Sequence, residues 1–192
     1  MFLPIVAYGS PILRKLARDI SPDEPGLKEL LENMWDTMYK SAGVGLAAPQ
    51  INKDIRLFVV DSVQIFENQE PEEVGTYPDE PGFKGVFINA KIIKLEGNPW
   101  SYNEGCLSIP KIREDVMRPQ SVTMEYFNED FEKQTQTFNG LTARIILHEY
   151  DHIEGKLFID HISPLKRTLL KRKLEDISKG KVRVDYRMSF PK

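Results

Sequence analysis

The chain cannot form an intramolecular disulfide bond, because Cys106 is the only cysteine among its 192 residues. It has no apolar run of the length that crosses a membrane, so no membrane contact is expected. Its first residues contain neither the basic stretch nor the long apolar core of a signal peptide. These absences predict a protein of a reducing cytoplasm.

An excess of positive charge is also missing. The formal net charge is −3, which argues against affinity of the whole molecule for nucleic acid. We therefore do not expect DNA as a partner. Neither an internal repeat nor a linker divides the sequence. The length suits one domain, residues 1–192, with a sizeable core.

The most informative feature present is His148-Glu149-Tyr150-Asp151-His152, which follows an apolar stretch. Residues four apart share one helix face, so both imidazoles can reach the same metal ion. Glu149 follows the first histidine and can handle the protons of an attacking water. The pattern predicts a hydrolytic metal site. The plainer alternative is an amphipathic helix whose histidines pack at the edge of the core.

A catalytic site of this kind needs a third protein ligand and one open position. Downstream, the candidates are Glu154, Asp160 and His161, but none has the H-x-x-G-x-x-H spacing of metzincins. His161 follows a short apolar run, residues 156–160, that reads as strand-like. A histidine in such a place is more often a surface or hinge residue than a ligand.

Upstream, Cys106 is the better candidate for the third ligand. It lies in Glu104-Gly105-Cys106-Leu107-Ser108, where the glycine permits close approach of the backbone. A thiolate with His148 and His152 makes a Cys-His-His site that keeps one position open. A lone cysteine is usually a buried, inert thiol, but beside the histidine motif we favour the ligand interpretation.

A third motif, Gly43-Val44-Gly45-Leu46-Ala47-Ala48-Pro49-Gln50, has neither the Walker lysine nor the glycine spacing of a phosphate loop. The three motifs, in this order, resemble those of peptide deformylases. The resemblance runs from the N-terminal Pro-Ile-Leu-Arg stretch to Ser163-Pro164-Leu165. One departure is Leu147, which stands where the family often has glutamine, at a position that is not a ligand.

The resemblance implies a metal-dependent hydrolase that removes the formyl group from N-formylmethionyl peptides and releases formate. Its partner is then the nascent formyl-Met polypeptide. The implied metal ligands are Cys106, His148 and His152. The family is known for Fe(II) in cells and for oxygen sensitivity, and Zn(II), Ni(II) or Co(II) can substitute. The donor set alone does not select among these metals.

The resemblance also implies catalytic roles for three further groups. Glu149 takes the proton of the attacking water and passes it to the leaving amine. The side-chain amide of Gln50 and the backbone N–H of Leu107 stabilise the oxyanion. Ala48 precedes a proline and is expected to be extended, which suits Gln50 facing a cleft.

Substrate contacts follow from the same resemblance. Gly45 binds the substrate backbone, and the implied methionine pocket is lined by Val44, Tyr102, Leu141, Arg144 and Ile145. Because Arg144 is charged where some members are aliphatic, we expect its stem along the wall and its head in water. Arg113 and Arg118 are expected to contact substrate or to pair with Glu104, although an ordinary surface arginine is an equal alternative for Arg113.

Periodicity predicts the elements that carry these motifs. Apolar residues at helical spacing predict a helix that begins near Pro25-Gly26 and ends before Gly43. Residues 56–60 and 85–89 read as strands, and the acidic stretch 66–83 between them as an exposed insertion loop. Residues 122–127 and 135–138 predict a hairpin.

Asn139 is a plausible N-cap for the metal-binding helix. A second helix is predicted from Ser163-Pro164 through Lys179, with Gly180 as its stop. Its basic run is most simply a solvated face, and contact with the ribosome is the weaker alternative. Together these elements predict an α+β fold, with antiparallel strands packed around a central metal-bearing helix and a C-terminal helix.

Two other function classes stay open at this point. A zinc endopeptidase shares the histidine motif but should take its third ligand from downstream. A purely structural metal module should have a closed site with four protein ligands, and the sequence offers no clear fourth one.

Overall fold

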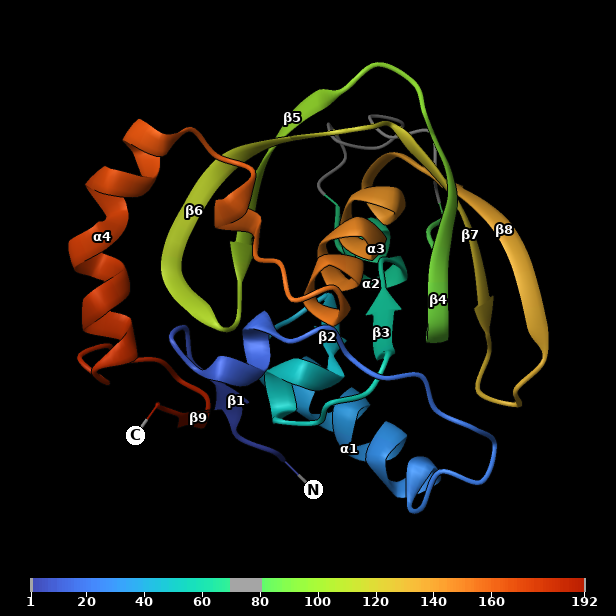
Figure 1. Ribbon diagram of the computed structural model, residues 1–192. Coiled ribbons are helices and arrows are strands. Elements are labelled where there is room, and N and C mark those ends of the chain that lie inside the picture. The colour runs from blue at the N-terminus through green and yellow to red at the C-terminus, as the bar shows by residue number, and fades with distance from the viewer. Residues whose placement is uncertain (1, 70–80, 192) are drawn as a thin grey trace.

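The computed structural model describes residues 2–69 and 81–191 (Figure 1). The helices are α1 (Leu27–Lys40), α2 (Val63–Glu67), α3 (Gly140–Ile153) and α4 (Pro164–Ser178), with 3₁₀ helices η1 (Pro11–Arg14), η2 (Ala48–Ile51) and η3 (Phe158–Asp160). The strands are β1 (Ile5–Val6), β2 (Gly45–Ala47), β3 (Leu57–Asp61), β4 (Lys84–Glu96), β5 (Trp100–Cys106), β6 (Ile109–Arg118), β7 (Ser121–Phe127), β8 (Lys133–Asn139) and β9 (Met188–Ser189). None of the helices described has the length and apolar character needed to span a membrane.

The predicted α+β arrangement is confirmed. Five strands form an antiparallel sheet in the order β2-β3-β4-β7-β8, and β5 and β6 form a separate antiparallel hairpin. Helix α3 runs through the middle of the molecule, between the sheet and the hairpin, while α4 lies outside against β6 (Figure 1). The short strands β1 and β9 pair in parallel near the two chain ends.

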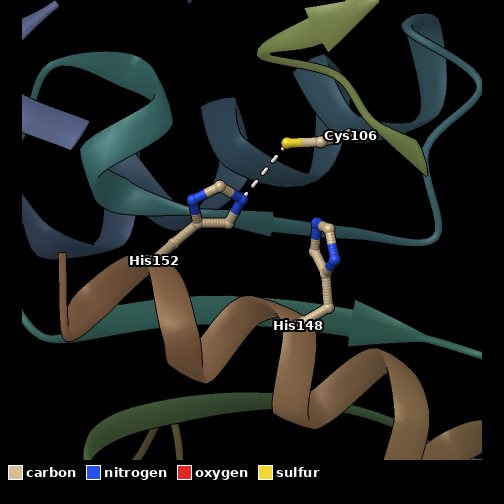
Figure 2. A group of neighbouring side chains, drawn as sticks. All are labelled: Cys106, His148 and His152. Atoms are coloured by element: carbon tan, nitrogen blue, oxygen red, sulfur yellow. Dashed lines mark hydrogen bonds between the residues drawn. The ribbon is translucent and has the colours of Figure 1, made fainter. Parts of the chain in front are cut away.

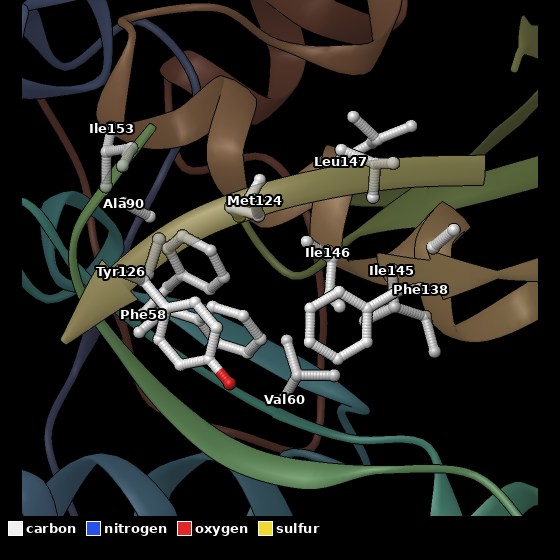
Figure 3. Close-up of a cluster of buried hydrophobic side chains, with 14 of the residues drawn as sticks. Phe58, Val60, Ala90, Met124, Tyr126, Phe138, Ile145, Ile146, Leu147 and Ile153 are labelled. Atoms are coloured by element: carbon white, nitrogen blue, oxygen red, sulfur yellow. The ribbon is translucent and has the colours of Figure 1, made fainter. Parts of the chain in front are cut away.

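The face of the sheet that packs against α3 is apolar because buried apolar residues alternate with more exposed ones along strands such as β7. In β7 every second residue is buried, so Val122, Met124 and Tyr126 face α3. Rings from neighbouring strands stack there. The Phe58 ring lies in this cluster (Figure 3), and its centroid is 4.7 Å from that of Phe87. Burying one such side chain contributes about 1.5–3 kcal/mol. This core therefore fixes the position of α3 against the sheet.

Helix α3 is buried on nearly all sides, and its buried residues include charged ones such as Arg144 and Asp151. Leu147, the departure from the family pattern, is 4% exposed and packs in the core with Ile146. Asn139 occupies the N-cap position as predicted, but its side chain makes no capping hydrogen bond. The start of α3 is thus held without a side-chain cap from Asn139.

The two flanking helices match their predictions. Helix α1 buries a face that includes Leu31, Met34 and Met38. Helix α4 begins with the Ser163 hydroxyl accepting a hydrogen bond from the Lys166 backbone N–H at 3.3 Å. Lys179 is its C-cap.

Three predicted segments need correction. The strand predicted at 85–89 extends to 84–96. In the loop predicted at 66–83, Phe66 and Glu67 belong to helix α2 and Phe83 packs edge-on against Phe138, while residues 70–80 lie outside the described part. The strand-like run 156–160 contains η3, because the Asp160 carboxylate accepts a hydrogen bond from Leu157 N–H at 2.9 Å and closes a turn.

Candidate metal centre and active site

Three side chains from two elements meet at the centre of the fold. Cys106 ends β5, and His148 and His152 lie one turn apart on α3. Their ligand atoms all lie within 4.8 Å of one another, and Cys106 Sγ is 3.3 Å from His152 Nε2 (Figure 2). Over residues 2–69 and 81–191, no other histidine, cysteine or carboxylate joins this group.

The shape of the β5–β6 turn brings the cysteine over α3. The register shifts between Gly105 and Cys106, so that Cys106 pairs with Ile109 across a tight turn. A Cβ on Gly105 would lie 2.8 Å from Arg113 Nη1. The absence of a side chain at Gly105 thus leaves room for the Arg113 side chain, which crosses this position.

The charge state of Cys106 suits a metal ligand. Burial opposes ionisation of the Cys106 thiol, but the neighbouring His152 and His148 lower its pKa from 9.0 to about 5. Burial of His148 likewise opposes its charged form, yet Cys106 and Glu104 raise the pKa of His148 well above its ordinary value. The cysteine is thus a thiolate near neutral pH, which is the form that binds metals.

Glu104 orients the first histidine. Its Oε2 lies 3.0 Å from His148 Nδ1, and Arg118 donates to both carboxylate oxygens at 2.7 and 3.0 Å. Burial of Glu104 opposes ionisation, but hydrogen bonds from His148 and Arg118 outweigh it and hold its pKa well below the ordinary range. With Nδ1 engaged, Nε2 of His148 is the nitrogen left for a metal. The predicted pairing of Arg118 with Glu104 is confirmed.

The expected solvent-exposed head of Arg144 is wrong. The residue is 2% exposed, and Nη1 donates to Glu104 Oε1 and to the Val116 carbonyl, both at 2.9 Å. Its guanidinium also lies 4.5 Å from the centre of the Trp100 ring. A buried cation is tolerated where its charge is paired, and Glu104 provides that pairing.

The downstream ligand candidates are engaged elsewhere. Each forms an ion pair or hydrogen bond outside the ligand group: Glu154 with Arg56, Asp160 with Arg14 and His161 with Asp151. None joins the cluster that Cys106 completes. The arrangement that an H-E-x-x-H endopeptidase would need is therefore not formed by these residues.

Glu149 lies beside the ligand group as a buried carboxyl group. It is 4% exposed, and burial raises its pKa from 4.5 to about 7. Within the described part of the chain, no hydrogen-bond partner reaches its Oε2 atom. A Cβ on Gly45 would lie only 2.5 Å from Glu149 Oε1, so the glycine makes room for this carboxyl group.

Gln50 is buried with its amide aimed at the same place. Its Oε1 accepts a hydrogen bond from Ala47 N–H at 2.8 Å, which leaves Nε2 facing Cys106 Sγ at 3.5 Å and Ser108 Oγ at 3.4 Å. The expectation of an extended Ala48 is wrong, because η2 begins there and the extended residue is Ala47. The 3₁₀ turn, rather than an extended chain, directs Gln50 inward.

One cavity of about 830 Å³ joins these groups. Its lining includes every predicted catalytic and substrate-binding residue, which are Val44, Gly45, Gln50, Tyr102, Leu107, Arg113, Leu141, Arg144, Ile145 and Glu149, together with the ligands Cys106 and His148. His152 lies at the ligand group but is not part of that lining.

One wall of the cavity was not predicted from the sequence. Arg183, Val184, Asp185 and Tyr186 line it, and the Tyr186 hydroxyl donates to the Leu107 carbonyl at 2.7 Å. Alternating apolar residues from Val182 to Met188 are the signal that could have indicated an extended segment here.

Comparison with known proteins agrees with this geometry. Residues 2–168 match the family model described as polypeptide deformylase. The peptide deformylase of Flavobacterium johnsoniae is 55% identical over 190 residues, which cover 99% of this chain and 96% of that protein. The crystal structure of a peptide deformylase from Legionella pneumophila has a TM-score of 0.79 at 34% identity, covering 95% of this chain and 99% of that one. The crystal structure of a peptide deformylase from Synechococcus elongatus in complex with actinonin has a TM-score of 0.74 at 32% identity, covering 93% of this chain and 87% of that one.

Proposed function

The chain belongs to the peptide deformylase family, whose enzymes remove the N-formyl group from nascent peptides, and from this premise we propose which of its residues carry the reaction. The observation that carries the proposal is the meeting of Cys106, His148 and His152 beside the buried carboxyl group of Glu149 in one cavity. An endopeptidase with a downstream third ligand has no support in this arrangement.

The donor set fits a divalent first-row metal. We assign as ligands Cys106 Sγ and the Nε2 atoms of His148 and His152, since the thiol ionises below neutral pH and Glu104 occupies Nδ1 of His148. When bound, such a metal supplies Lewis-acid chemistry to water and to the formyl oxygen. We propose Fe(II) in cells, with Zn(II), Ni(II) or Co(II) able to replace it. The need for reduced Cys106 favours a reducing compartment, the cytoplasm.

Glu149 is the proton carrier in this proposal. Its pKa of about 7 lies near the working pH, where a general base is most effective. Oε2 accepts the proton of the attacking water and then delivers it to the leaving amine. Because Gly45 leaves space against Oε1, the carboxyl group can stay close to the ligand group during both transfers.

Two hydrogen-bond donors are proposed to stabilise the charge that develops on the formyl oxygen. One is Gln50 Nε2, whose direction is fixed by the bond from Ala47 N–H to Oε1. The other is the backbone N–H of Leu107, in the turn that follows Cys106. Donors held in place before the reaction need no reorganisation when the oxyanion forms.

The methionine side chain is proposed to enter the part of the cavity lined by Val44, Tyr102, Leu141, Arg144 and Ile145. The head of Arg144 is neutralised by Glu104, so its stem can serve as an apolar wall despite the charge. Gly45 offers its backbone to the peptide. Arg113 is exposed at the rim, where its guanidinium already binds Asn103.

Substrate discrimination tests this proposal. Formyl-Met-Ala-Ser should release formate, while acetyl-Met-Ala-Ser should stay nearly untouched and casein uncut, because the space at the ligand group is proposed to admit only a formyl group. Cleavage of casein at a comparable rate would replace the deformylase assignment with that of an endopeptidase.

The metal assignment has its own test. Protein loaded with Fe(II) without oxygen should lose activity in air faster than protein loaded with Ni(II), because iron bound to a thiolate is open to oxidation. Equal rates of decay would contradict an oxidisable iron centre.

A finer proposal concerns the partner that presents the nascent peptide. Helix α4 exposes Arg167, Lys171, Arg172 and Lys173 to solvent, and we propose that this face contacts the ribosome. Binding to ribosomes should then weaken steeply with salt and on reversal of these charges. Binding that is insensitive to both would contradict the proposal.

A further inference from the structure

The C-terminal segment, residues 181–189, is fixed across the cavity at three points. At its start, Lys181 N–H donates to the Asp176 carbonyl at 2.8 Å. At its end, β9 pairs with β1, with Ile5 N–H donating to the Arg187 carbonyl at 2.9 Å and Ala7 N–H to the Ser189 carbonyl at 2.8 Å (Figure 1).

The third point of attachment lies in the active site itself. The Tyr186 hydroxyl donates to the Leu107 carbonyl, and the Tyr186 and Leu107 side chains pack against the same core cluster. The residues between Lys181 and Tyr186 are therefore held as a wall of the cavity. This wall lies after residue 168, where the match to the family model ends.

The side chains of this wall alternate in direction. Val182, Val184 and Tyr186 are half-buried, while Arg183 and Asp185 are exposed at the mouth of the cavity. The same cavity reaches Cys106 and His148 at its inner end. The peptide of a substrate whose formyl group lies at the ligand group can therefore pass Arg183 and Asp185 at this mouth.

The exposed charges at the mouth are mainly positive. Lys111, Arg113 and Arg183 are exposed there, against Asp185 as the exposed carboxylate of the lining. For Lys111 and Arg183, no ion-pair partner is found within residues 2–69 and 81–191. The mouth is thus opposite in sign to the chain as a whole, whose net charge is −3. A free exposed cation is available to a ligand without first breaking an internal pair.

We propose that Arg183 is a specificity-determining residue that favours formyl peptides with an acidic side chain after the formylmethionine. The inference rests on the proposed function, which puts the formyl group at the inner end of the cavity. An exposed ion pair typically changes an equilibrium by roughly 1.5- to fivefold and is weakened by salt. A preference of that size is expected in kcat/KM, and it should shrink as ionic strength rises.

The test uses two peptide series, formyl-Met-X-Ala and formyl-Met-Ala-X, in which X is Glu, Gln or Lys. For the wild-type protein at low salt, kcat/KM should fall from Glu to Gln to Lys in at least one series, by roughly two- to fivefold a step. Arg183→Glu should invert that order. Arg187→Glu is the matched control: it makes the same change in charge on an exposed residue of the same segment that does not line the cavity, and it should keep the wild-type order.

Two results would overturn the inference. One is a wild-type enzyme that does not distinguish Glu from Lys in either series. The other is an equal change of preference in Arg183→Glu and Arg187→Glu, which would indicate a general effect of net charge. Activity on the Gln peptides reports that each variant is folded. If no formyl peptide releases formate, the proposed function itself fails, which is a different outcome from absence of a charge preference.

Discussion

Replacing Glu149 with glutamine should stabilise the metal-stripped protein at alkaline pH while it removes activity. Glu149 is 4% exposed, and burial raises its pKa from 4.5 to about 7. Between those values the folded protein binds a proton that the unfolded chain has lost. The free energy of unfolding of the wild-type protein therefore falls as pH rises through this window.

The size of the effect follows from the two pKa values. Their difference, from 4.5 to about 7, corresponds to about 3.5 kcal/mol of unfolding free energy at ~1.4 kcal/mol for each pH unit. About 3 kcal/mol of this is lost above pH 4.5, because the carboxyl group of the unfolded chain is already half ionised at that pH. Glutamine at this position also leaves buried amide hydrogens to satisfy, which costs about 1–3 kcal/mol but does not depend on pH. Comparing wild type and variant at two pH values cancels that second contribution.

Urea unfolding of both chelator-treated proteins at about pH 4.5 and about pH 8.5 measures this change in the free energy of unfolding. Between these pH values, wild type should lose about 3 kcal/mol relative to Glu149→Gln. In the metal-loaded proteins, formate release should fall by about 10²- to 10⁴-fold with metal content unchanged. Parallel pH dependence of the two stabilities would refute the argument that a buried carboxyl group with a raised pKa is the proton carrier.

Three other substitutions probe the surroundings of that group. Gln50→Ala should lower kcat by about 10²- to 10³-fold with KM and metal content unchanged, and a silent variant would remove Gln50 from the transition state. Gly45→Ala would place a Cβ 2.5 Å from Glu149 Oε1 and displace that carboxyl group. The kcat should therefore fall, and the pH dependence of kcat should shift. An unchanged pH dependence would show that the carboxyl group is not displaced. Tyr186→Phe removes the hydrogen bond to the Leu107 carbonyl, so the free energy of unfolding should fall by about 1 kcal/mol. The variant should lose activity through a lower kcat more than through a higher KM. An unchanged kcat would separate Tyr186 from the catalytic turn.

The sequence was sufficient for the features that local patterns encode. Helical spacing of apolar residues predicted α1, and the start and stop residues Ser163-Pro164 and Gly180 predicted α4. The four-residue interval between His148 and His152 placed both imidazoles on one helix face, as the structure has them. Cys106 follows because it is a lone thiol in a glycine-containing turn. The roles of these residues remain proposals, as does the organisation of residues 1–192 as a single domain.

The features that were missed depend on partners far away in the chain. Arg144 was expected in water because its neighbours do not reveal Glu104, which lies 40 positions earlier and neutralises it. The wall formed by residues 181–189 depends on pairing between β9 and β1, at opposite ends of the sequence. Periodicity cannot indicate such long-range contacts.

The central claim is that Cys106, His148 and His152 hold the metal on which deformylation depends. Its most direct test measures the metal-to-protein ratio and formate release from formyl-Met-Ala-Ser together, for wild type and Cys106→Ala prepared without oxygen. We predict about one metal ion per chain with active release for wild type, and the loss of both in the variant. Stoichiometric metal and full activity in Cys106→Ala would contradict the account.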